Sequence, residues 1–490
     1  MKRRHAIIIG GGLGGLALSL RLVINGWKVT VCEKASTPGG KMNLFEKDGY
    51  RFDTGPSLVT MPEIFEELFT VGGSRLSDHV KLQRIEPLAH YTYADGTRFV
   101  HSTSMPDWLA TVRNLDARDV DGFWRFMRLG ARLHEVSRST FLSRSPSEPP
   151  EFRDLSSLKH MPIRHGWGNY NRTIEQHFHS PHLRQLYNRY PTYVGSSPYR
   201  APATLALIPY IESAFGGWFL MGGLYTLVTA VVELIRKHGG EILASAEVVR
   251  INLDGAKVTG VRLADGTTLT ADAVVMNGDA SQIPQLLGEP GASVIPPDRR
   301  SLAGIVFLLG INKKLSGIHH HNISFSSDYE REFRQLFDEQ RFPDDPTVYV
   351  NIPSRTDPSL APSDGESAFV MANAPAADGN EWNPTEIESA WQRVYGRLRK
   401  SGFPDLDGSI VVRDVWTPAR LAQRYAMPGG SIYGLASHGW KSAFFRPANR
   451  DRSIHGLYRV GGSSHPGGGT PMVLLSAKIT SRLMERDQRA

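Results

Sequence analysis

The sequence predicts an α/β fold, and three observations support this prediction. A short apolar strand at residues 6–9 runs into the glycine-rich segment 10–15, after which apolar residues recur with helical spacing. A second glycine-rich segment, 461–471, lies between a strand pattern and a mostly apolar helix pattern. Between these two, residues 224–276 have the pattern of a helix, a strand, a hairpin and another strand. We therefore expect the chain to leave a first α/β unit and later return to it.

The first glycine segment fits a Rossmann-type turn that binds the pyrophosphate of a dinucleotide. Its glycines allow a tight turn and a close approach of the backbone to the pyrophosphate, and the following helix N-terminus attracts the phosphate charge. A second strand, Lys28–Cys32, ends at Glu33, which we expect to accept from ribose hydroxyls. The alternative is a glycine-rich turn in an ordinary strand-helix unit. The glycines expected at the cofactor are Gly10, Gly12, Gly14 and Gly15.

Two further motifs indicate a flavin dinucleotide. They are the segments 38–41 and 49–56, which follow the second strand and which a nicotinamide dinucleotide domain does not need. A flavin ring lies far from its adenosine end, and a second glycine pair lets the backbone pass beside the ribityl chain. Taken alone, either stretch is also compatible with a surface turn. The cofactor prediction is FAD, and the residues expected to bind it here are Gly39, Gly40, Lys41, Asp53, Gly55 and Pro56.

The C-terminal glycine segment is expected to complete the same site. Residues 457–460 form a strand pattern, Thr470 is placed as an N-cap, and Pro471 is placed in the first helical position. The positive end of this helix should face the pyrimidine edge of the flavin, where negative charge gathers on reduction. The residues expected at the cofactor are Gly461, Gly462, Gly469, Thr470, Pro471 and Met472.

These motifs make the chain resemble the bacterial phytoene desaturases, the carotenoid desaturase branch of the FAD-dependent, amine-oxidase-like flavoproteins. The resemblance covers nearly the whole length and includes the segments 52–56, 193–198, 222–224, 274–279, 444–447 and 465–471. It implies a glutathione-reductase-like, Rossmann-type FAD-binding domain with Val248, Asn277 and Asp279 at the cofactor. The Gly-Gly-Gly-Thr-Pro form of the last loop differs from the alanine-containing form common in phytoene desaturases, so the subfamily stays open.

The domain organisation that we expect is discontinuous. Residues 1–75, 220–284 and 450–490 form the FAD-binding domain. Residues 76–219 form a helical insertion on the substrate and membrane side, and residues 285–449 form a substrate-binding domain. Within the FAD-binding domain, we expect a helix at 224–238, a strand at 241–252, a hairpin at 258–269 and a strand at 273–276.

The resemblance implies an enzyme that introduces double bonds into a linear, phytoene-like carotenoid precursor. Hydride passes from an allylic carbon to flavin N5, and a base or water takes the proton. Apolar residues and glycines within 210–225 are expected to line the polyene tunnel. Arg153 and Asp154 are the catalytic candidates by resemblance, and the alternative for this pair is a surface salt bridge or a helix cap.

Other functions stay open at this point. Within the family, the alternative is a carotenoid oxygenase that forms terminal aldehydes. Outside it, the alternatives are an FAD-dependent amine oxidase and a non-enzymatic, flavin-binding lipid carrier. No motif chooses between oxygen and a quinone as electron acceptor, between C30 and C40 substrates, or among numbers of desaturation steps.

Composition favours a cytoplasmic protein that binds the inner membrane peripherally. The net charge of +7 and the pI near 9.3 suit nucleic acid or anionic lipid, and the absence of a nucleic-acid motif favours lipid. Basic and aromatic residues mix within 123–200 and could rest on a bilayer, although a solvated helix face is an equal alternative. We expect no export signal and no transmembrane helix.

Cysteine and histidine usage predicts neither a disulfide nor a metal site. The single cysteine, Cys32, excludes an internal disulfide and fits a reducing compartment. The run His319-His320-His321 has no Cys, Asp or Glu at ligand spacing beside it. No cysteine lies near the C-terminal glycine loop, so we expect FAD to bind without a covalent link.

Overall fold

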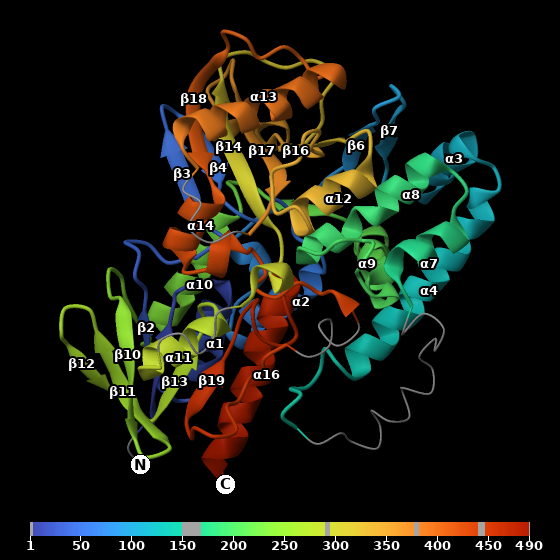
Figure 1. Cartoon of the computed structure of the whole chain (residues 1–490). Coiled ribbons are helices and arrows are strands. Elements are labelled where there is room, and N and C mark those ends of the chain that lie inside the picture. The colour runs from blue at the N-terminus through green and yellow to red at the C-terminus, as the bar shows by residue number, and fades with distance from the viewer. Residues whose placement is uncertain (1–2, 149–167, 290–294, 377–381, 440–445, 490) are drawn as a thin grey trace.

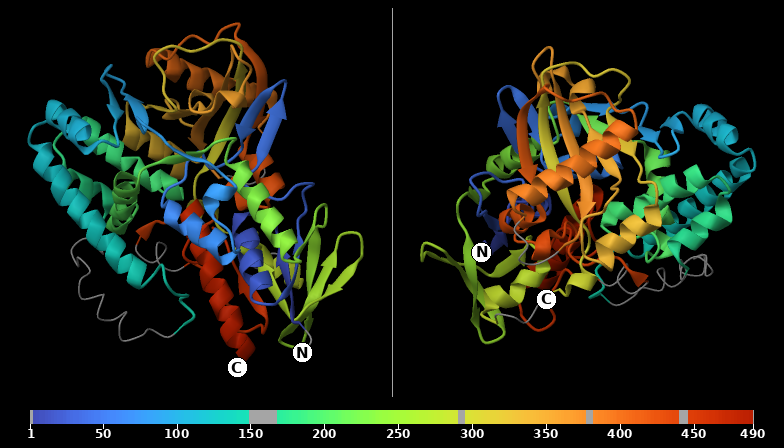
Figure 2. Two further views of the ribbon diagram at one scale, coloured as in Figure 1. Left: turned by 180° about the vertical axis from the view of Figure 1, so that it is seen from behind. Right: turned by 45° about the horizontal axis from the view of Figure 1, so that its top comes forward.

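The computed structural model describes residues 3–148, 168–289, 295–376, 382–439 and 446–489 (Figure 1). The catalytic candidates Arg153 and Asp154 lie outside these described residues. The main layers of the described part are a five-stranded sheet, a seven-stranded sheet and a layer of helices. The N-terminus and the C-terminal helix lie at the same end of the molecule (Figures 1 and 2).

The first sheet is parallel, and its strands come from three distant parts of the chain. Its order is β19-β13-β1-β2-β9, with every neighbouring pair parallel. Strands buried on both faces require almost continuous apolar residues, and β1 meets this with Ala6 to Ile9. The strands are β1 (His5–Ile9), β2 (Lys28–Cys32), β9 (Glu241–Leu243), β13 (Ala273–Met276) and β19 (Leu457–Arg459).

Helices cover one face of this sheet and a small antiparallel sheet covers the other. Alternation along β1 sends Ala6 and Ile8 into the helical core and Ile7 and Ile9 into the core beneath the small sheet. The helices are α1 (Leu13–Ile24), α2 (Pro62–Val71), α10 (Tyr225–Lys237) and α16 (Thr470–Arg489). The small sheet contains β10 (Val248–Asp254), β11 (Lys257–Leu263) and β12 (Thr268–Thr270).

The prediction of one strand over 241–252 is wrong. The chain forms β9 and then β10, and each belongs to a different sheet. Between them, Ser245 has a positive φ of 54°, and the backbone N–H of Ala246 donates to the carbonyl of Glu33. The intervening turn therefore redirects the chain from the edge of the parallel sheet to the small sheet. The predicted helix at 224–238, hairpin at 258–269 and strand at 273–276 are confirmed.

The second sheet is mixed and has the order β18-β14-β17-β16-β15-β6-β7. On one face, Ile305, Phe307 and Val370 pack against α13 (Pro384–Lys400). The alternate residues, such as Val306 and Met371, face the opposite way, toward the cavity described below. The strands are β6 (Ala89–Thr92), β7 (Arg98–His101), β14 (Ala303–Ile311), β15 (His321–Ser324), β16 (Val348–Asn351), β17 (Glu366–Ala374) and β18 (Ile410–Trp416).

A helical layer packs beside this sheet (Figure 2). Its core contains aromatic side chains that include Phe126, Tyr187 and Phe325. The helices are α3 (Met105–Leu115), α4 (Asp119–Ser139), α7 (Tyr170–His177), α8 (Pro181–Asn188), α9 (Leu207–Phe215) and α12 (Tyr329–Phe337). The segment 76–219 is not purely helical, because β6 and β7 join the second sheet through β15. Short polar-apolar alternation in 89–101 was the signal for these strands.

The remaining elements connect these layers. The short strands are β3 (Leu44–Lys47), β4 (Tyr50–Asp53), β5 (Leu82–Arg84) and β8 (Trp218–Leu220), and the other α-helices are α11 (Ile283–Leu287) and α14 (Pro418–Tyr425). The 3-10 helices are η1 (Leu76–Asp78), η2 (Tyr190–Val194), η3 (Ala203–Ala206), η4 (Ala280–Gln282), η5 (Pro297–Arg299), η6 (Pro353–Arg355), η7 (Pro358–Leu360) and η8 (Pro428–Gly430). No described helix combines the length and the apolar character needed to cross a membrane.

Candidate active site

A cavity of about 830 Å³ is lined by residues of the parallel sheet, the mixed sheet and the helical layer. One part lies at the carboxyl ends of β1, β2 and β13, where ligands bind in open parallel sheets. The other part lies between the second sheet and α9, where Val306, Met371, Leu207 and Ile211 form apolar walls. The same cavity can therefore hold a nucleotide at one side and an apolar molecule at the other.

The glycine turn after β1 lies on the cavity wall and packs closely against two other segments of that wall. Gly10 has a positive φ of 98°, and a Cβ on Gly14 would lie 2.8 Å from Asn277 Oδ1 and 3.1 Å from Gly461 Cα. The N-cap of α1, Gly12, has no side-chain cap, and the first turn of α1 has no acidic residue. The first N–H groups of α1 thus have no capping side chain and can bind an anion such as a phosphate.

Glu33 lies at the end of β2 on the cavity wall. One carboxylate oxygen accepts from the backbone N–H of Gly11 (2.7 Å), and the other accepts from that of Ala35 (2.8 Å). Each carboxylate oxygen has a second lone pair. The two backbone bonds fix the carboxylate and leave it able to accept from a ligand hydroxyl.

Two cations lie beside the C-terminal glycine loop. The buried Arg446 guanidinium donates to backbone carbonyls that include Gly462 (3.3 Å), and Lys41 Nζ donates to the carbonyl of Ile432. Burial lowers the pKa of Lys41 to about 8, an effect that the charge of Asp279 opposes and that of Arg446 increases. Burial also lowers the pKa of Arg446 to about 10. A negatively charged ligand in the cavity would stabilise both cations.

The helix after the C-terminal loop begins at Thr470, which makes Pro471 its second residue and not its first. The loop before it contains a cis peptide bond between His465 and Pro466, and the buried His465 Nε2 contacts the Phe141 carbonyl at 2.7 Å. The N-terminus of α16 lies on the cavity wall, where its partial positive charge adds to that of the two cations.

The structure brings most of the predicted cofactor residues to one cavity. Those on its wall are Gly10, Gly12, Gly14, Glu33, Gly39, Gly40, Lys41, Gly55, Pro56, Val248, Asn277, Asp279, Gly461, Gly462, Gly469, Thr470, Pro471 and Met472. They belong to three chain segments that the parallel sheet and its loops bring together.

Gly15 and Asp53 are not on the cavity wall. A Cβ on Gly15 would lie 2.6 Å from the Gly10 carbonyl oxygen, so this glycine permits close packing of α1 against the turn. Asp53 accepts from the backbone N–H groups of Leu224 (2.9 Å) and Tyr225 (3.3 Å) at the start of α10. Burial raises the pKa of Asp53 to about 6, although these hydrogen bonds oppose the shift. In the described part of the chain, Asp53 therefore caps the N-terminus of α10.

The predicted tunnel segment 210–225 reaches the cavity only at Ile211 and Glu212. The residues from Trp218 to Leu220 form β8, which pairs with β5 outside the cavity. Residues of β14, β17 and the first turns of α9 contribute to the apolar wall instead. These residues lack a local sequence signature, because they share a wall only after the sheet and the helical layer have packed.

Sequence reasoning also missed a polar cluster in the apolar part of the cavity, formed by Arg189, Tyr193, Glu212 and Tyr349. Glu212 is 2% exposed and accepts from the hydroxyls of Tyr190 (2.6 Å) and Tyr193 (3.0 Å). The one available signal was Tyr193, which begins the 193–198 motif. The other members come from separate elements.

The histidine run forms no metal site in the described part of the chain. No group of three or more potential ligands among the described residues could hold a metal ion. His320 contacts Thr356 Oγ1 (2.6 Å), and His321 contacts the Tyr349 hydroxyl (2.7 Å). Burial lowers the pKa of His320 to about 3. These two histidines are buried, and His321 contacts the polar cluster through Tyr349.

Comparison with known proteins identifies the family. Residues 13–484 match the family of flavin containing amine oxidoreductases. The chain belongs to this family. It is therefore an FAD-dependent oxidoreductase, and the uncapped helix start, the glycine turn and the fixed Glu33 fit that cofactor.

Relatives of this flavin enzyme act on carotenoids, as their names state. The chain is 35% identical to a 1-hydroxycarotenoid 3,4-desaturase from a Flavobacterium species, over 98% of this chain and 99% of the relative. It is 34% identical to a 4,4'-diapolycopene oxygenase from a Methylomonas species, over 97% of each chain. An oxidoreductase structure from Methanosarcina mazei shares the fold, with a TM-score of 0.65, 18% identity and coverage of 98% of this chain and 100% of that one.

Proposed function

We propose that this flavin enzyme is a carotenoid desaturase that introduces double bonds into a linear polyene. The observation that carries the proposal is one cavity with the cofactor residues at one side and apolar walls at the other. The relatives named as a hydroxycarotenoid desaturase and a diapolycopene oxygenase support a carotenoid substrate. An amine oxidase is not favoured by these relatives.

Bound FAD supplies a two-electron acceptor for hydride. The first turn of α1 and Glu33 would hold the nucleotide, and Lys41 with Arg446 would balance negative charge near the C-terminal loop. Val306, Met371 and the α9 residues would align the polyene and exclude water, which is the principal task of the protein in such a reaction. We propose oxygen or a quinone as the electron acceptor.

The test of this function is anaerobic mixing of the FAD-loaded protein with a linear polyene. We expect the polyene absorption to move to longer wavelength while the flavin absorption falls and the product loses a pair of hydrogens. In a parallel aerobic reaction, incorporation of oxygen into the product would assign the oxygenase activity instead. No change with polyenes of either C30 or C40 length would contradict the proposal. Later addition of oxygen or a quinone to the reduced enzyme identifies the acceptor.

The cofactor assignment has its own test in Gly14→Val. The new side chain would overlap Asn277 and the space beside Gly461, so we expect purified Gly14→Val to lose most of its FAD, measured as flavin released on denaturation. Gly396→Ala on α13 is the matched control, because a Cβ there meets no heavy atom within 4 Å. Normal FAD content in Gly14→Val would contradict the proposed site.

We propose that the described enzyme also binds the membrane surface through α4. The exposed face of α4 carries Trp124, Arg125, Arg128 and Arg132, with Trp124 45% exposed. The neighbouring Phe123, Phe126, Met127 and Leu129 are buried and do not contribute, contrary to expectation. Cosedimentation with anionic vesicles should fall for Arg128→Glu with Arg132→Glu, and neutral vesicles should bind neither protein.

The domain boundaries given above and peripheral attachment to the cytoplasmic side of the inner membrane belong to the same proposal. The parallel sheet supports the grouping of the first, middle and last segments, because its strands come from all three. Limited proteolysis with and without FAD tests the boundaries: cofactor binding should protect sites in these three segments together.

A further inference from the structure

The polar cluster is built around a carboxylate and a guanidinium that do not form a direct ion pair. Arg189 Nη1 donates to the Tyr193 hydroxyl (3.1 Å), and this hydroxyl donates to Glu212 (3.0 Å). The Tyr91 hydroxyl accepts a second bond from Arg189 Nη1 (3.3 Å). The guanidinium carbon also lies 5.0 Å from the centre of the Tyr193 ring. The tyrosine therefore links the two opposite charges.

This arrangement is costly in a cavity that holds only hydrocarbon. Removal of a carboxylate and a guanidinium from water carries a large free-energy cost, which only well-formed hydrogen bonds offset. A pure hydrocarbon ligand would add none of these bonds and would displace any water that supplied them. Apolar side chains of similar volume would serve such a ligand better.

Arg189 retains hydrogen-bonding capacity toward the cavity. A guanidinium has five N–H donors. Of these, Nη1 makes the bonds to the two tyrosines, whereas no described residue accepts a hydrogen bond from Nε or Nη2. Arg189 and Glu212 both lie on the cavity wall. Each oxygen of Glu212 accepts one tyrosine hydroxyl, which leaves a lone pair on each.

We propose that Arg189, Tyr193 and Glu212 form a subsite for a hydroxyl group carried by the polyene substrate. This inference rests on the proposed carotenoid function and deepens it by naming an oxygenated polyene as substrate. A hydroxyl matches the subsite because it accepts from the free N–H groups of Arg189 and donates to Glu212. Arg189 would repel the positive charge of an amine, and Glu212 would repel the negative charge of a carboxylate.

The test compares two polyenes of equal length and conjugation, one with a terminal hydroxyl and one without. Their dissociation constants for the FAD-loaded protein follow from the change in polyene absorption on binding, with turnover recorded in parallel. We expect the wild type to bind the hydroxylated polyene roughly tenfold more tightly or better, as for a charge-assisted hydrogen bond. Arg189→Met and Glu212→Gln should each reduce this ratio toward one.

Three further variants separate recognition from damage to the fold. Tyr193→Phe keeps the ring and removes only the linking hydroxyl, so it should lower the ratio with normal FAD content. Met371→Leu changes an apolar part of the wall and should alter both dissociation constants alike. Arg189→Lys keeps the charge and should retain part of the selectivity that Arg189→Met loses.

The outcomes distinguish the subsite from the proposed reaction. Equal binding of the two polyenes by the wild type, or a ratio unchanged in Arg189→Met and Tyr193→Phe, overturns the subsite even when both polyenes are desaturated. Selective binding that these variants abolish supports the subsite, and the same result without any turnover would refute the desaturase activity alone.

Discussion

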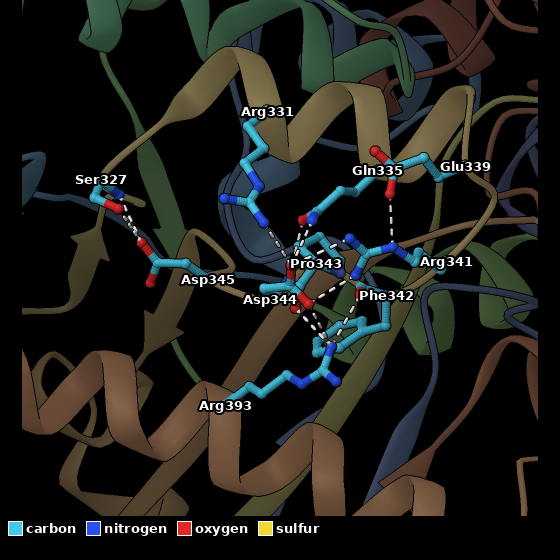
Figure 3. Close-up of polar contacts among 10 residues, drawn as sticks. All are labelled: Ser327, Arg331, Gln335, Glu339, Arg341, Phe342, Pro343, Asp344, Asp345 and Arg393. Carbon is cyan, nitrogen blue, oxygen red and sulfur yellow. Dashed lines mark hydrogen bonds and ion pairs between the residues drawn. The ribbon is translucent and has the colours of Figure 1, made fainter.

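Two polar clusters of similar chemistry lie in different surroundings. The cluster of Arg189 and Glu212 lines the cavity, and Glu212 is 2% exposed. The second cluster centres on Asp344 near the surface, where Asp344 accepts from Arg341 (2.7 Å), Arg331 (3.0 Å) and Gln335 (2.7 Å), and its side chain is 43% exposed (Figure 3). Both clusters combine carboxylate with guanidinium.

The carboxylates of the two clusters shift their pKa values in opposite directions, and the difference follows from burial and not from the residue types present. Hydrogen bonds from Arg341 and Gln335 hold the pKa of Asp344 well below its usual range. Burial raises the pKa of Glu212, and hydrogen bonds from Tyr190 and Tyr193 and the charge of Arg189 only partly oppose it. Around Asp344, water can replace any lost partner, whereas inside the cavity each lost partner leaves a polar group without compensation.

Glu212→Ala should have the largest effect on stability. Tyr190 and Tyr193 lose their shared acceptor and Arg189 loses the nearby opposite charge, so we expect the free energy of unfolding to fall by about 4 kcal/mol. Urea unfolding at saturating FAD measures the change. Glu212→Gln keeps a carbonyl acceptor and should lose less. A loss below about 1 kcal/mol would mean that water in the cavity satisfies the tyrosines, and the contrast with the surface cluster would disappear.

Glu332 offers a second comparison, because it follows Arg331 on α12 but points inward and is 1% exposed. Burial raises its pKa from 4.5 to about 7, although hydrogen bonds from Thr347 and Ser326 oppose the shift. The folded protein therefore keeps a proton that the unfolded chain releases. Stability should fall by about 3 kcal/mol as the pH rises from about 4.5 to about 7.

The pH dependence is measured as the difference between wild type and Glu332→Gln. The neutral amide cannot titrate, so this variant should lack that part of the decrease in unfolding free energy between pH 4.5 and about 7. Asp344→Asn, an exposed substitution near Glu332, should keep this decrease in unfolding free energy. Identical pH profiles for wild type and Glu332→Gln would show that Glu332 keeps an ordinary pKa despite its burial.

The nucleotide side of the molecule was predictable because its signals are local. The strand at 6–9, the glycine turn and the start of α1 are consecutive in sequence, and the structure places the strand at His5–Ile9. The glycines were identified because only that residue type tolerates the backbone contacts at positions such as Gly15. A single stretch of about 30 residues therefore contains both the motif and its geometric reason.

The polyene side was not predictable in the same way. Arg189 follows α8, Glu212 lies on α9 and Tyr349 lies on β16, so the cluster exists only after three separate elements have packed. Asp53 lies off the cavity wall for a related reason: it accepts from backbone N–H groups at the start of α10, and sequence cannot tell a ligand contact from a helix-end contact. Sequence position alone carries no sign of which side chains share a cavity.

The smallest effect is expected for Asp344→Ala in the surface cluster. Its removal leaves Arg331, Arg341 and Arg393 in water, so the free energy of unfolding should fall by about 1 kcal/mol or less. Most of this loss should vanish at high ionic strength, because salt screens exposed charges, whereas the loss in Glu212→Ala should persist. A salt-independent loss as large as that of Glu212→Ala would show that the arginines around Asp344 form a network whose strength does not depend on burial.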